Sequence, residues 1–373
     1  QSEKVADAIK KFAAEHGHRV GLIVFDECHR LKNDGKTGQG SAAKRHDAAR
    51  LLLDELPHAK LLVQTGTPVL TGVAEGIALL EMIEPGVTEA RKLQRRNSIA
   101  GALDLHTAYT LHGVRFRPDY GVAVEQPQVK VNGSTYYGGR HKRTGEVTKY
   151  DVVGSLPTAE LPLCELDDAT YKKLNEASQP WQSWLAIERV LTPVRIPAIV
   201  AACKPRTVVY SHNTGSSGKD PLIDSIAKAI GKRYRCAVLD GRNPADRAAI
   251  IAKYKQGDID VLVCSSVLGE GVDGLQDIGS RLVINCPPWT DGAYDQLVAR
   301  WLRTGQKNTV QVVIPLTYYT RPDGLRVSLD VDRLARIGHR ASIADAVLDG
   351  TIPATFISEA ALRDRAIALL TEA

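Results

Sequence analysis

Short runs of consecutive apolar residues alternate along this chain with longer segments in which apolar residues recur every three or four positions. The second pattern predicts helices over Glu3–Glu15 and Ala42–Glu55. The apolar runs at Gly21–Phe25 and Lys60–Val63 are continuous rather than alternating, which is typical of strands buried on both faces of a parallel sheet. Strands that alternate with helices in this way predict an α/β domain.

The same alternation returns after Arg206 and is more regular there. It predicts a self-sufficient, doubly wound domain with a parallel sheet. The strands are expected at Thr207–Tyr210, Cys236–Leu239, Val261–Cys264, Leu282–Asn285 and Val310–Ile314. The helices are expected at Pro221–Ile230, Pro244–Lys255 and Gly292–Leu302, and two or three more should follow Val331.

We therefore expect four parts: a first α/β lobe over 1–165, a helical connector over 166–204, a second lobe over 205–330 and C-terminal helices over 331–373. The first lobe changes character between 91 and 157, where basic residues are interleaved with Tyr and Gly. This pattern predicts an irregular, partly β insertion. Such an insertion is compatible with contact to DNA and equally with a solvated surface hairpin.

Composition narrows the class of protein. Of the 373 residues, 43% are hydrophobic and 24% are charged, which excludes a disordered chain, a collagen-like repeat and a coiled coil. The net charge of +5 is only mildly basic, so it is compatible with a nucleic-acid partner without indicating one. No apolar run reaches the length of a membrane-spanning helix, and the six cysteines stand singly. We expect an intracellular protein, cytoplasmic in a bacterium or virus and nuclear in a eukaryote, without membrane contact, structural zinc or disulfides.

Two acidic residues, Asp26 and Glu27, directly follow the first apolar strand. A carboxylate at the carboxyl end of a buried strand can hold Mg²⁺ through water, and its neighbour can act as a general base toward an attacking water. Alone this pattern is weak, because many strands end in acidic residues. Its continuation is far more specific, since the segment from Asp26 to Asn33 reads Asp-Glu-Cys-His-Arg-Leu-Lys-Asn.

That segment resembles motif II of the superfamily-two helicases, and most closely that of Swi/Snf-type DNA translocases, which reads DE-x-H-R-[LI]-K-N. Gln64–Pro68 resembles their motif III, which couples nucleotide state to the relative position of the lobes. In the second lobe, Val208–Ser211 resembles motif IV, Ser265–Gln276 motif V and Asp291–Gln306 motif VI. The resemblance spans residues 21 to about 350 and implies two RecA-like, doubly wound lobes, the first of them incomplete.

Two arginines of motif VI, Arg300 and Arg303, lead to a further prediction. Residues three apart on a helix share a face, so both guanidinium groups can point the same way, with Gln296 one turn earlier. A planar, permanently charged guanidinium suits the stabilisation of a transferring phosphoryl group. We therefore predict that these side chains act as arginine fingers. Two unrelated arginines on an exposed helix are the alternative.

One element of such a motor is missing from this sequence. No phosphate-binding loop of the form GxxxxGK[ST] precedes Asp26. The first lobe has two clear strands, and without further strands their apolar edges would be exposed. Because the sequence starts at Gln1 and contains a single methionine, Met82, we expect it to be part of a longer polypeptide. A second chain that supplies the loop is the alternative.

The resemblance implies ATP bound between the lobes, Mg²⁺ held near Asp26, and double-stranded DNA held mainly through its phosphates. The implied catalytic residues are Asp26, Glu27, Arg300 and Arg303. The implied residues that couple nucleotide state to motion are His29, Gln64, Thr65, Gly66, Thr67, Gly269, Gly271, Asp273 and Gln296. The candidate DNA contacts are Arg91, Lys92, Arg95, Arg96, Arg115, Arg117, Ser265 and Ser266.

The expected function is ATP-driven translocation on double-stranded DNA, with this fragment inactive by itself. Two alternatives stay open. One is a DNA-binding or regulatory subunit without ATPase activity of its own, complemented by a partner chain. The other is a translocase associated with a nuclease, although the sequence contains no evident nuclease-type carboxylate cluster.

Overall fold

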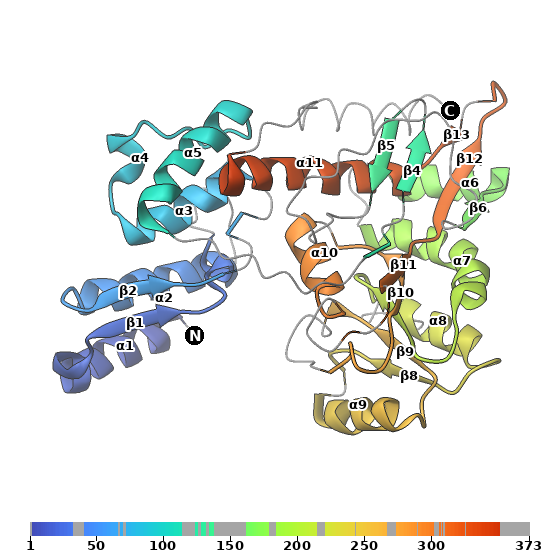
Figure 1. Ribbon diagram of the computed structural model, residues 1–373, viewed down its shortest axis with the longest axis horizontal. Helices are drawn as coiled ribbons and strands as arrows, with labels where there is room; N and C mark the ends of the chain where they lie inside the picture. Colours follow the sequence, from blue (N-terminus) through green and yellow to red (C-terminus); the bar gives the residue numbers. More distant parts are fainter. Residues whose placement is uncertain are drawn as a thin grey trace. The chain divides into compact units, whose positions relative to one another are not determined.

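The chain divides into two compact units in the computed structural model (Figure 1). Unit 1 comprises Gln1–Phe116 and His339–Ser358, and unit 2 comprises Arg117–Gly338 and Glu359–Ala373. The structure describes residues 2–32, 41–65, 68–69, 72–113, 124–125, 128–131, 134–137, 162–178, 184–214, 221–242, 244–266, 274–288, 290–301, 306, 308, 310–324 and 326–350.

Unit 1 begins with a parallel pair of strands, β1 and β2, whose partners run from Leu22 beside Lys60 to Phe25 beside Val63. Its elements are α1 (Ser2–His16), a 3-10 turn (Gly17–Arg19), β1 (Leu22–Phe25), a second 3-10 turn, η2 (Cys28–Leu31), α2 (Ser41–Glu55), β2 (Lys60–Val63), α3 (Val73–Ile83), α4 (Val87–Ala90) and α5 (Ile99–His112). The predicted strands and the first two predicted helices are confirmed within one residue at each end.

The two-stranded sheet of unit 1 is covered on one face only within the described residues. Helices α1 and α2 contact each other, so both lie on the same side of the sheet. Ile23 faces them and is 7% exposed, whereas Leu22, Val24 and Leu62 on the other face are 53%, 48% and 43% exposed. The prediction that the first strand is buried on both faces is therefore wrong for the described chain, because a second layer is lacking there.

The core of unit 1 is helical. Buried residues of α3 and α5, including Ile77, Leu80 and Leu105, pack against Ile343 and Val347 of α11 (Leu329–Asp349). The prediction of an irregular segment after residue 91 is wrong for α5. This helix begins at the N-cap Ser98, whose side chain accepts from the Gly101 N–H, and continues because its apolar face fills the core.

Unit 2 contains a six-stranded sheet in the order β3-β11-β10-β7-β9-β8, in which every pair is parallel. A smaller sheet has the order β13-β12-β6, and β4 pairs with β5. The strands are β3 (Val124–Glu125), β4 (Gln128–Val131), β5 (Ser134–Tyr137), β6 (Leu163–Glu165), β7 (Thr207–Ser211), β8 (Cys236–Leu239), β9 (Val261–Cys264), β10 (Arg281–Cys286), β11 (Val310–Val313), β12 (Leu316–Thr320) and β13 (Arg326–Val327). The helices are α6 (Asp168–Ala177), α7 (Trp184–Ala202), α8 (Leu222–Ile230), α9 (Arg247–Gln256) and α10 (Asp291–Val298), with a short 3-10 turn at Pro244–Asp246.

Successive residues of the central strands point to opposite faces of this sheet. Val209 and Val263 pack with Ile223 and Ile226 of α8 on one face. On the other face, Val208 and its neighbours pack with side chains of α9, α10 and α11, including Tyr254, Leu297 and Leu334. Helices therefore cover both faces, and the predicted doubly wound parallel fold is confirmed.

Two predicted helical regions differ from the structure. Helix α10 ends at Val298 rather than at residue 302, because the N–H groups of Arg300 and Trp301 bond to carbonyls three residues back. The prediction that Arg300 lies on that helix is therefore wrong. The segment after Val331 forms one long helix, α11, as far as Asp349. The predicted further helices beyond residue 350 lie outside the described residues.

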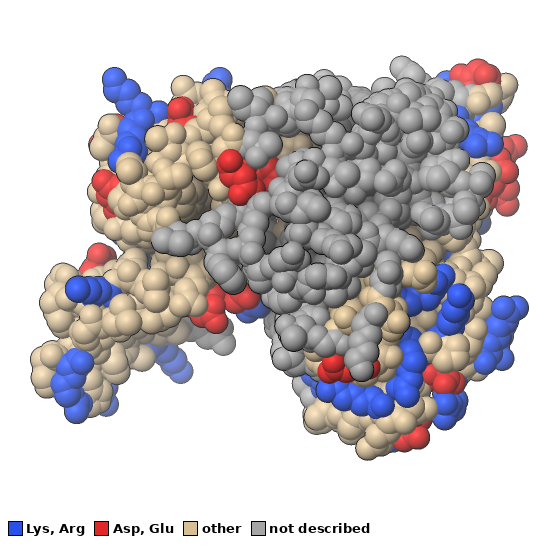
Figure 2. Space-filling view, in the orientation of Figure 1, with Lys and Arg blue, Asp and Glu red and all other residues tan. Residues whose placement is uncertain are grey.

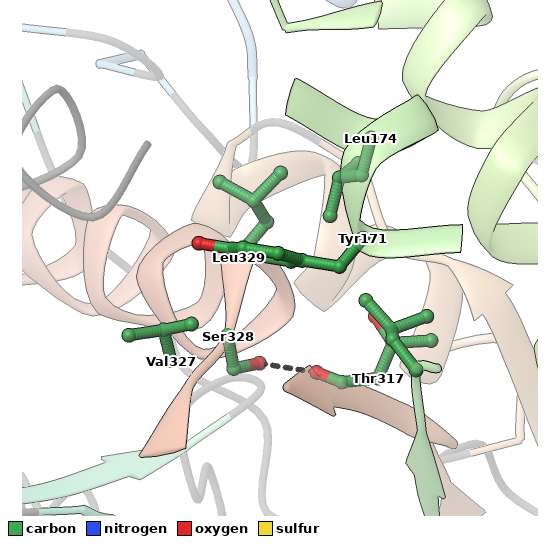
Figure 3. Close-up of a pocket in the computed structure, with 7 residues that line it drawn as sticks. Tyr171, Leu174, Thr317, Val327, Ser328 and Leu329 are labelled. Carbon is green, nitrogen blue, oxygen red and sulfur yellow. Dashed lines mark hydrogen bonds between the residues drawn. The ribbon is translucent and has the colours of Figure 1, made fainter. Parts of the chain in front are cut away.

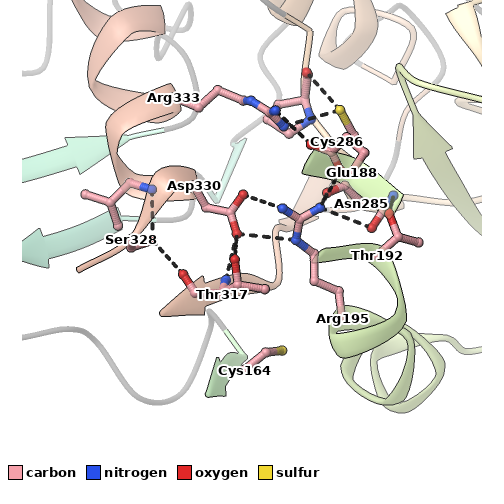
Figure 4. A network of polar contacts seen from close by, with 12 residues as sticks. Cys164, Glu188, Thr192, Arg195, Asn285, Cys286, Thr317, Ser328, Asp330 and Arg333 are labelled. Atoms are coloured by element: carbon pink, nitrogen blue, oxygen red, sulfur yellow. Dashed lines mark hydrogen bonds and ion pairs between the residues drawn. The ribbon is translucent and has the colours of Figure 1, made fainter. Parts of the chain in front are cut away.

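Four charged side chains are buried together where α7 meets the first turns of α11 (Figure 4). Arg195 donates to Glu188 at 2.8 Å and to Asp330 at 2.5 Å, and Arg333 pairs with Glu188 at 2.7 Å. Asp330 also accepts from the backbone N–H and the hydroxyl of Thr317. Burial would raise the pKa of Glu188, but the two guanidinium groups more than offset this and lower it to about 2.

Replacing Arg195 with methionine is expected to lower the free energy of unfolding by about 3–5 kcal/mol, as measured by urea denaturation. Glu188 and Asp330 would remain buried without the cation that they share, and solvent does not reach this position, since the Arg195 side chain is 0% exposed. The matched control, Arg189→Met, changes an exposed arginine of the same helix and should alter stability by less than about 0.5 kcal/mol. A loss below about 1 kcal/mol at Arg195 would contradict this expectation.

The smaller sheet of unit 2 packs over a narrow cavity of about 10 Å³ (Figure 3). Tyr171 and Leu174 of α6 lie on one side of it, and Ser328 donates to the Thr317 carbonyl at 2.6 Å on the other. This volume is at the lower limit for a single water molecule. The cavity is therefore a packing gap rather than a ligand site.

All six cysteines lie within the described residues and are free thiols. Among the helices that the structure describes, none is long and apolar enough to cross a membrane.

Candidate functional site: the carboxyl ends of the parallel strands

The carboxyl ends of β1 and β2 bring the two strongest sequence motifs of unit 1 together. Because these strands are parallel neighbours, the residues that follow Phe25 lie beside those that follow Val63. The Gln64 N–H donates to the Phe25 carbonyl and the Cys28 N–H donates to the Gln64 carbonyl, both at 2.9 Å. Two backbone hydrogen bonds therefore fix one motif against the other.

Asp26 and Glu27 are both exposed at this edge. The Asp26 carboxylate accepts a hydrogen bond of 2.8 Å from the Glu27 N–H. Glu27 itself adopts the left-handed backbone conformation, with φ 49° and ψ 44°. A non-glycine residue in this region stores strain, and such positions cluster at functional sites. The conformation turns the chain sharply after β1, so that Glu27 lies above the strand end.

His29 connects the two motifs. Its Nδ1 lies 3.1 Å from Glu27 Oε2 and 3.0 Å from Thr65 Oγ1. Burial lowers the pKa of His29, although the neighbouring Glu27 carboxylate acts in the opposite direction. A ring held between these two oxygens can transmit a change at Glu27 to the segment that begins at Thr65.

Two further contacts anchor the segment after β1, and sequence reasoning missed the residues that supply them. Lys32 pairs with Glu75 of α3 at 2.7 Å, and His46 of α2 contacts the Leu31 carbonyl at 2.6 Å. Glu75 lies in the first turn of its helix, where an acidic residue is common for structural reasons alone. Its position therefore gave no signal of a role in the site.

Cys28, between the acidic pair and His29, is buried, and burial raises the pKa of its thiol to about 11. It is therefore protonated at neutral pH and fills space below the motif.

The residues of this edge fit a magnesium ion that is bound together with a nucleotide. Mg²⁺ in such sites keeps several waters and takes one or two carboxylates, with substrate phosphates as further ligands. Asp26 supplies an exposed carboxylate whose orientation the Glu27 N–H fixes. Within the described residues, no cluster of three or more His, Cys, Asp or Glu side chains could hold a metal by itself. When bound, the ion would neutralise phosphate charge.

In unit 2, the described candidate residues lie after the end of β9, within α10 or in the turn that follows α10. Ser265 and Ser266 come directly after β9, and the Ser265 N–H donates to the Leu239 carbonyl. Gln296 lies in α10 and Arg300 in the turn that follows it, both partly exposed. The buried Trp301 holds this turn in place.

The basic segment after α4 belongs to unit 1. Arg91, Lys92 and Arg96 are exposed there, whereas Arg95 lines a hollow of about 530 Å³ together with Arg50 and other side chains of α2, α3 and α4. The exposed side chains of Arg91, Lys92 and Arg96 can reach an anionic partner. The other predicted site residues lie outside the described part of the chain: Gly66, Thr67, Arg115, Arg117, Gly269, Gly271, Asp273 and Arg303.

Comparison with known proteins shows what parts of this chain are similar to. Residues 196–305 match the helicase conserved C-terminal domain. The chain is similar to the ATP-dependent RNA helicase rok1 of Neurospora crassa, with 30% identity over 192 residues, which is 49% of this chain and 23% of that protein. It is also similar to the DEAD-box ATP-dependent RNA helicase 41 of Arabidopsis thaliana, with 24% identity over 277 residues, which is 72% of this chain and 51% of that protein.

Residues 196–305 are therefore similar to the conserved C-terminal domain of helicases, and both relatives are named ATP-dependent RNA helicases. The chain spans about half or less of the length of these two relatives. Their names describe RNA helicases rather than Swi/Snf-type translocases, so the finer resemblance of the motifs supports a proposal only.

Proposed function

We propose that the full-length protein is an ATP-driven motor of the Swi/Snf type, which translocates on double-stranded DNA. The observation that carries the proposal is the position of His29 between Glu27 and Thr65, at 3.1 and 3.0 Å. These residues belong to the segments that resemble Swi/Snf motifs II and III. Coupling of hydrolysis to motion requires a contact between the general-base candidate, Glu27, and the motif that follows β2. His29 provides this contact.

In this proposal, this chain's own residues have distinct tasks. Asp26 helps to hold the nucleotide-bound Mg²⁺, and Glu27 accepts a proton from the water that attacks the γ-phosphate. Arg300 and Arg303 offset the charge that develops on the transferring group. Arg91, Lys92, Arg96 and the serines after β9 contact DNA phosphates, which makes binding sensitive to salt.

A second function has its own support, since both curated relatives described above are named RNA helicases. Under this alternative, ATP hydrolysis by the residues at the carboxyl ends of β1 and β2 would drive action on RNA. The two functions differ in the polymer that stimulates hydrolysis and in the mechanical outcome, because translocation along a duplex does not separate its strands.

The substrate is tested by measuring ATP hydrolysis of the full-length protein with matched 40-base-pair DNA and RNA duplexes and with single strands of each. We expect double-stranded DNA to stimulate hydrolysis at least about fivefold more than any RNA. We also expect ATP-dependent displacement of the third strand of a DNA triplex without unwinding of a forked duplex. Stimulation by RNA with unwinding of an RNA duplex would overturn the DNA proposal in favour of the RNA helicase.

A further inference from the structure

The amino ends of the central strands of unit 2 lie at the edge of the sheet opposite Ser265 and Ser266. Strands β10, β7, β9 and β8 are neighbours, and their first residues are in register: Arg281 lies beside Thr207, and Val261 lies beside both Thr207 and Cys236. In a doubly wound fold, the helices that precede these strands end at the same edge. The segments between helix ends and strand starts therefore form one continuous surface.

Basic side chains dominate this surface, which we call the amino-edge surface. Figure 2 shows Lys and Arg gathered over the part of unit 2 that contains α8 and α9. Its exposed cations are Lys204, Lys228, Lys232, Arg233, Arg235, Lys253 and Lys255, and its acidic residues are Asp258, Asp260 and Asp277. Cations therefore clearly outnumber carboxylates.

Two of the basic side chains at this edge, Arg235 and Arg206, bind other groups of the same unit. Arg235 donates twice to the Asp260 carboxylate, at 2.7 and 3.0 Å, so that this pair is neutral. The partly exposed Arg206 donates to the carbonyls of Tyr254 and Lys255 and so caps the end of α9. Gly257, with φ 95°, ends the same helix, and a side chain there would meet the Arg206 guanidinium at 2.9 Å.

Within the described part of the chain, the remaining cations neither neutralise a carboxylate nor cap a helix end with a side-chain hydrogen bond. Lys228, Lys232, Arg233 and Lys253 make no ion pair or hydrogen bond there through their side chains. Lys228 and Lys253 lie in the last turns of α8 and α9, where a positive charge also stabilises the helix end. Lys232 and Arg233 lie in the turn before β8, beyond the helix.

The chemistry of the amino-edge surface favours a polyanion over an acidic protein segment. The exposed large hydrophobic residues of the described chain are Val5, Phe12, Leu22, Val24, Leu62, Leu111 and Trp184, and none lies at this edge. A protein partner would need apolar or aromatic anchors at the centre of its contact. Separate lysines on flexible side chains suit phosphates, which they bind without regard to sequence.

The width of the amino-edge surface is also large enough to contact several phosphates of a DNA duplex. Four neighbouring strands at a spacing of about 4.8 Å give an edge about 15 Å wide. Double-stranded DNA carries about one phosphate charge per 1.7 Å of its axis, so this width faces several phosphates. We propose that the amino-edge surface, centred on Lys228, Lys232, Arg233 and Lys253, is a second binding surface for the backbone of double-stranded DNA. This surface is distinct from the DNA contacts proposed above for unit 1 and for the serines after β9. The choice of DNA as its partner rests on the proposed function.

The test compares Lys228→Glu/Lys232→Glu with Lys172→Glu/Lys173→Glu in the full-length protein. The control changes two exposed lysines of α6 in the same unit, so that the net charge is altered equally. Binding to a fluorescein-labelled 40-base-pair DNA is followed by anisotropy between 50 and 300 mM KCl. The amino-edge variant should raise the Kd at least about tenfold at 100 mM KCl and should reduce the slope of log K against log[KCl] by about 1.8, since each lost phosphate contact contributes about 0.9. The control should stay within about twofold.

The kcat for ATP hydrolysis at saturating DNA should be unchanged in the amino-edge variant, because the surface lies away from the ATPase residues. Equal weakening by both variants would mean that only net charge matters, and no weakening by the amino-edge variant would mean that Lys228 and Lys232 do not contact DNA. Either outcome overturns the proposal. If the glutamate variant does not fold, Lys228→Gln/Lys232→Gln replaces it, with an expected loss of about threefold or more. A wild-type protein that binds DNA through this surface without DNA-stimulated hydrolysis would refute the proposed motor and leave the surface standing.

Discussion

Replacing Arg300 with alanine is expected to lower the rate of ATP hydrolysis by about 10³-fold or more, with little change in nucleotide affinity. An arginine finger acts on charge that is present only in the transition state, so its loss reduces kcat rather than ground-state binding. Buried Val298 and Trp301 hold the turn that contains Arg300. The loss should therefore reflect the missing guanidinium and not a displaced backbone.

Steady-state hydrolysis at saturating nucleic acid measures this effect. Arg300→Lys should recover little activity, because an ammonium group lacks the planar fork of donors. Arg189→Ala, at an exposed site on α7, is the matched control and should retain full activity. If Arg300 and Arg303 act as a unit, the double alanine variant should lose little more than the more damaging single change. A loss below about tenfold at both positions would assign them a structural role.

Replacing Glu27 with glutamine is expected to reduce ATP turnover by about 10²- to 10⁴-fold while ATP still binds. Glutamine has the shape of glutamate but cannot accept the proton of the attacking water. Because its amide oxygen can still face His29, the contact that joins Glu27 to Thr65 through the ring is not lost for steric reasons.

Turnover is measured by phosphate release, and binding by titration with a fluorescent ATP analogue. Glu55→Gln, an exposed position at the end of α2, serves as the control and should leave both quantities unchanged. Undiminished turnover in the Glu27 variant would refute the general-base assignment, and a loss of binding equal to the loss of turnover would indicate a damaged fold.

Five strands of unit 2, β7 to β11, were predictable because parallel strands covered on both faces need unbroken apolar runs. Val261–Cys264 is such a run, and each of its residues is buried. The same reasoning gave the bounds of β1 and β2 but not their environment, since an apolar run does not reveal whether a second layer covers it. The ends of helices were harder to predict. Nothing in the periodicity of residues 292–302 distinguishes an α-helix from the tighter turn that begins after Val298.

The candidate site was predictable as a set of motifs but not as a set of contacts. The letters of motif II identify His29, but its position between Glu27 and Thr65 requires the parallel pairing of β1 and β2. The buried ion network was missed because charged residues on a helix ordinarily face solvent. Glu188 and Arg195, two turns apart on α7, share a face, and that spacing was the available signal.

The same network determines where α11 can lie along its own axis. A purely apolar helix face offers several positions of similar energy, each displaced by one turn of about 5.4 Å. A slide of one turn would part Asp330 from Arg195 and Arg333 from Glu188, and would leave charges buried without partners. Helix α11 therefore has a single register against α7, and this register is defined by charge rather than by apolar packing.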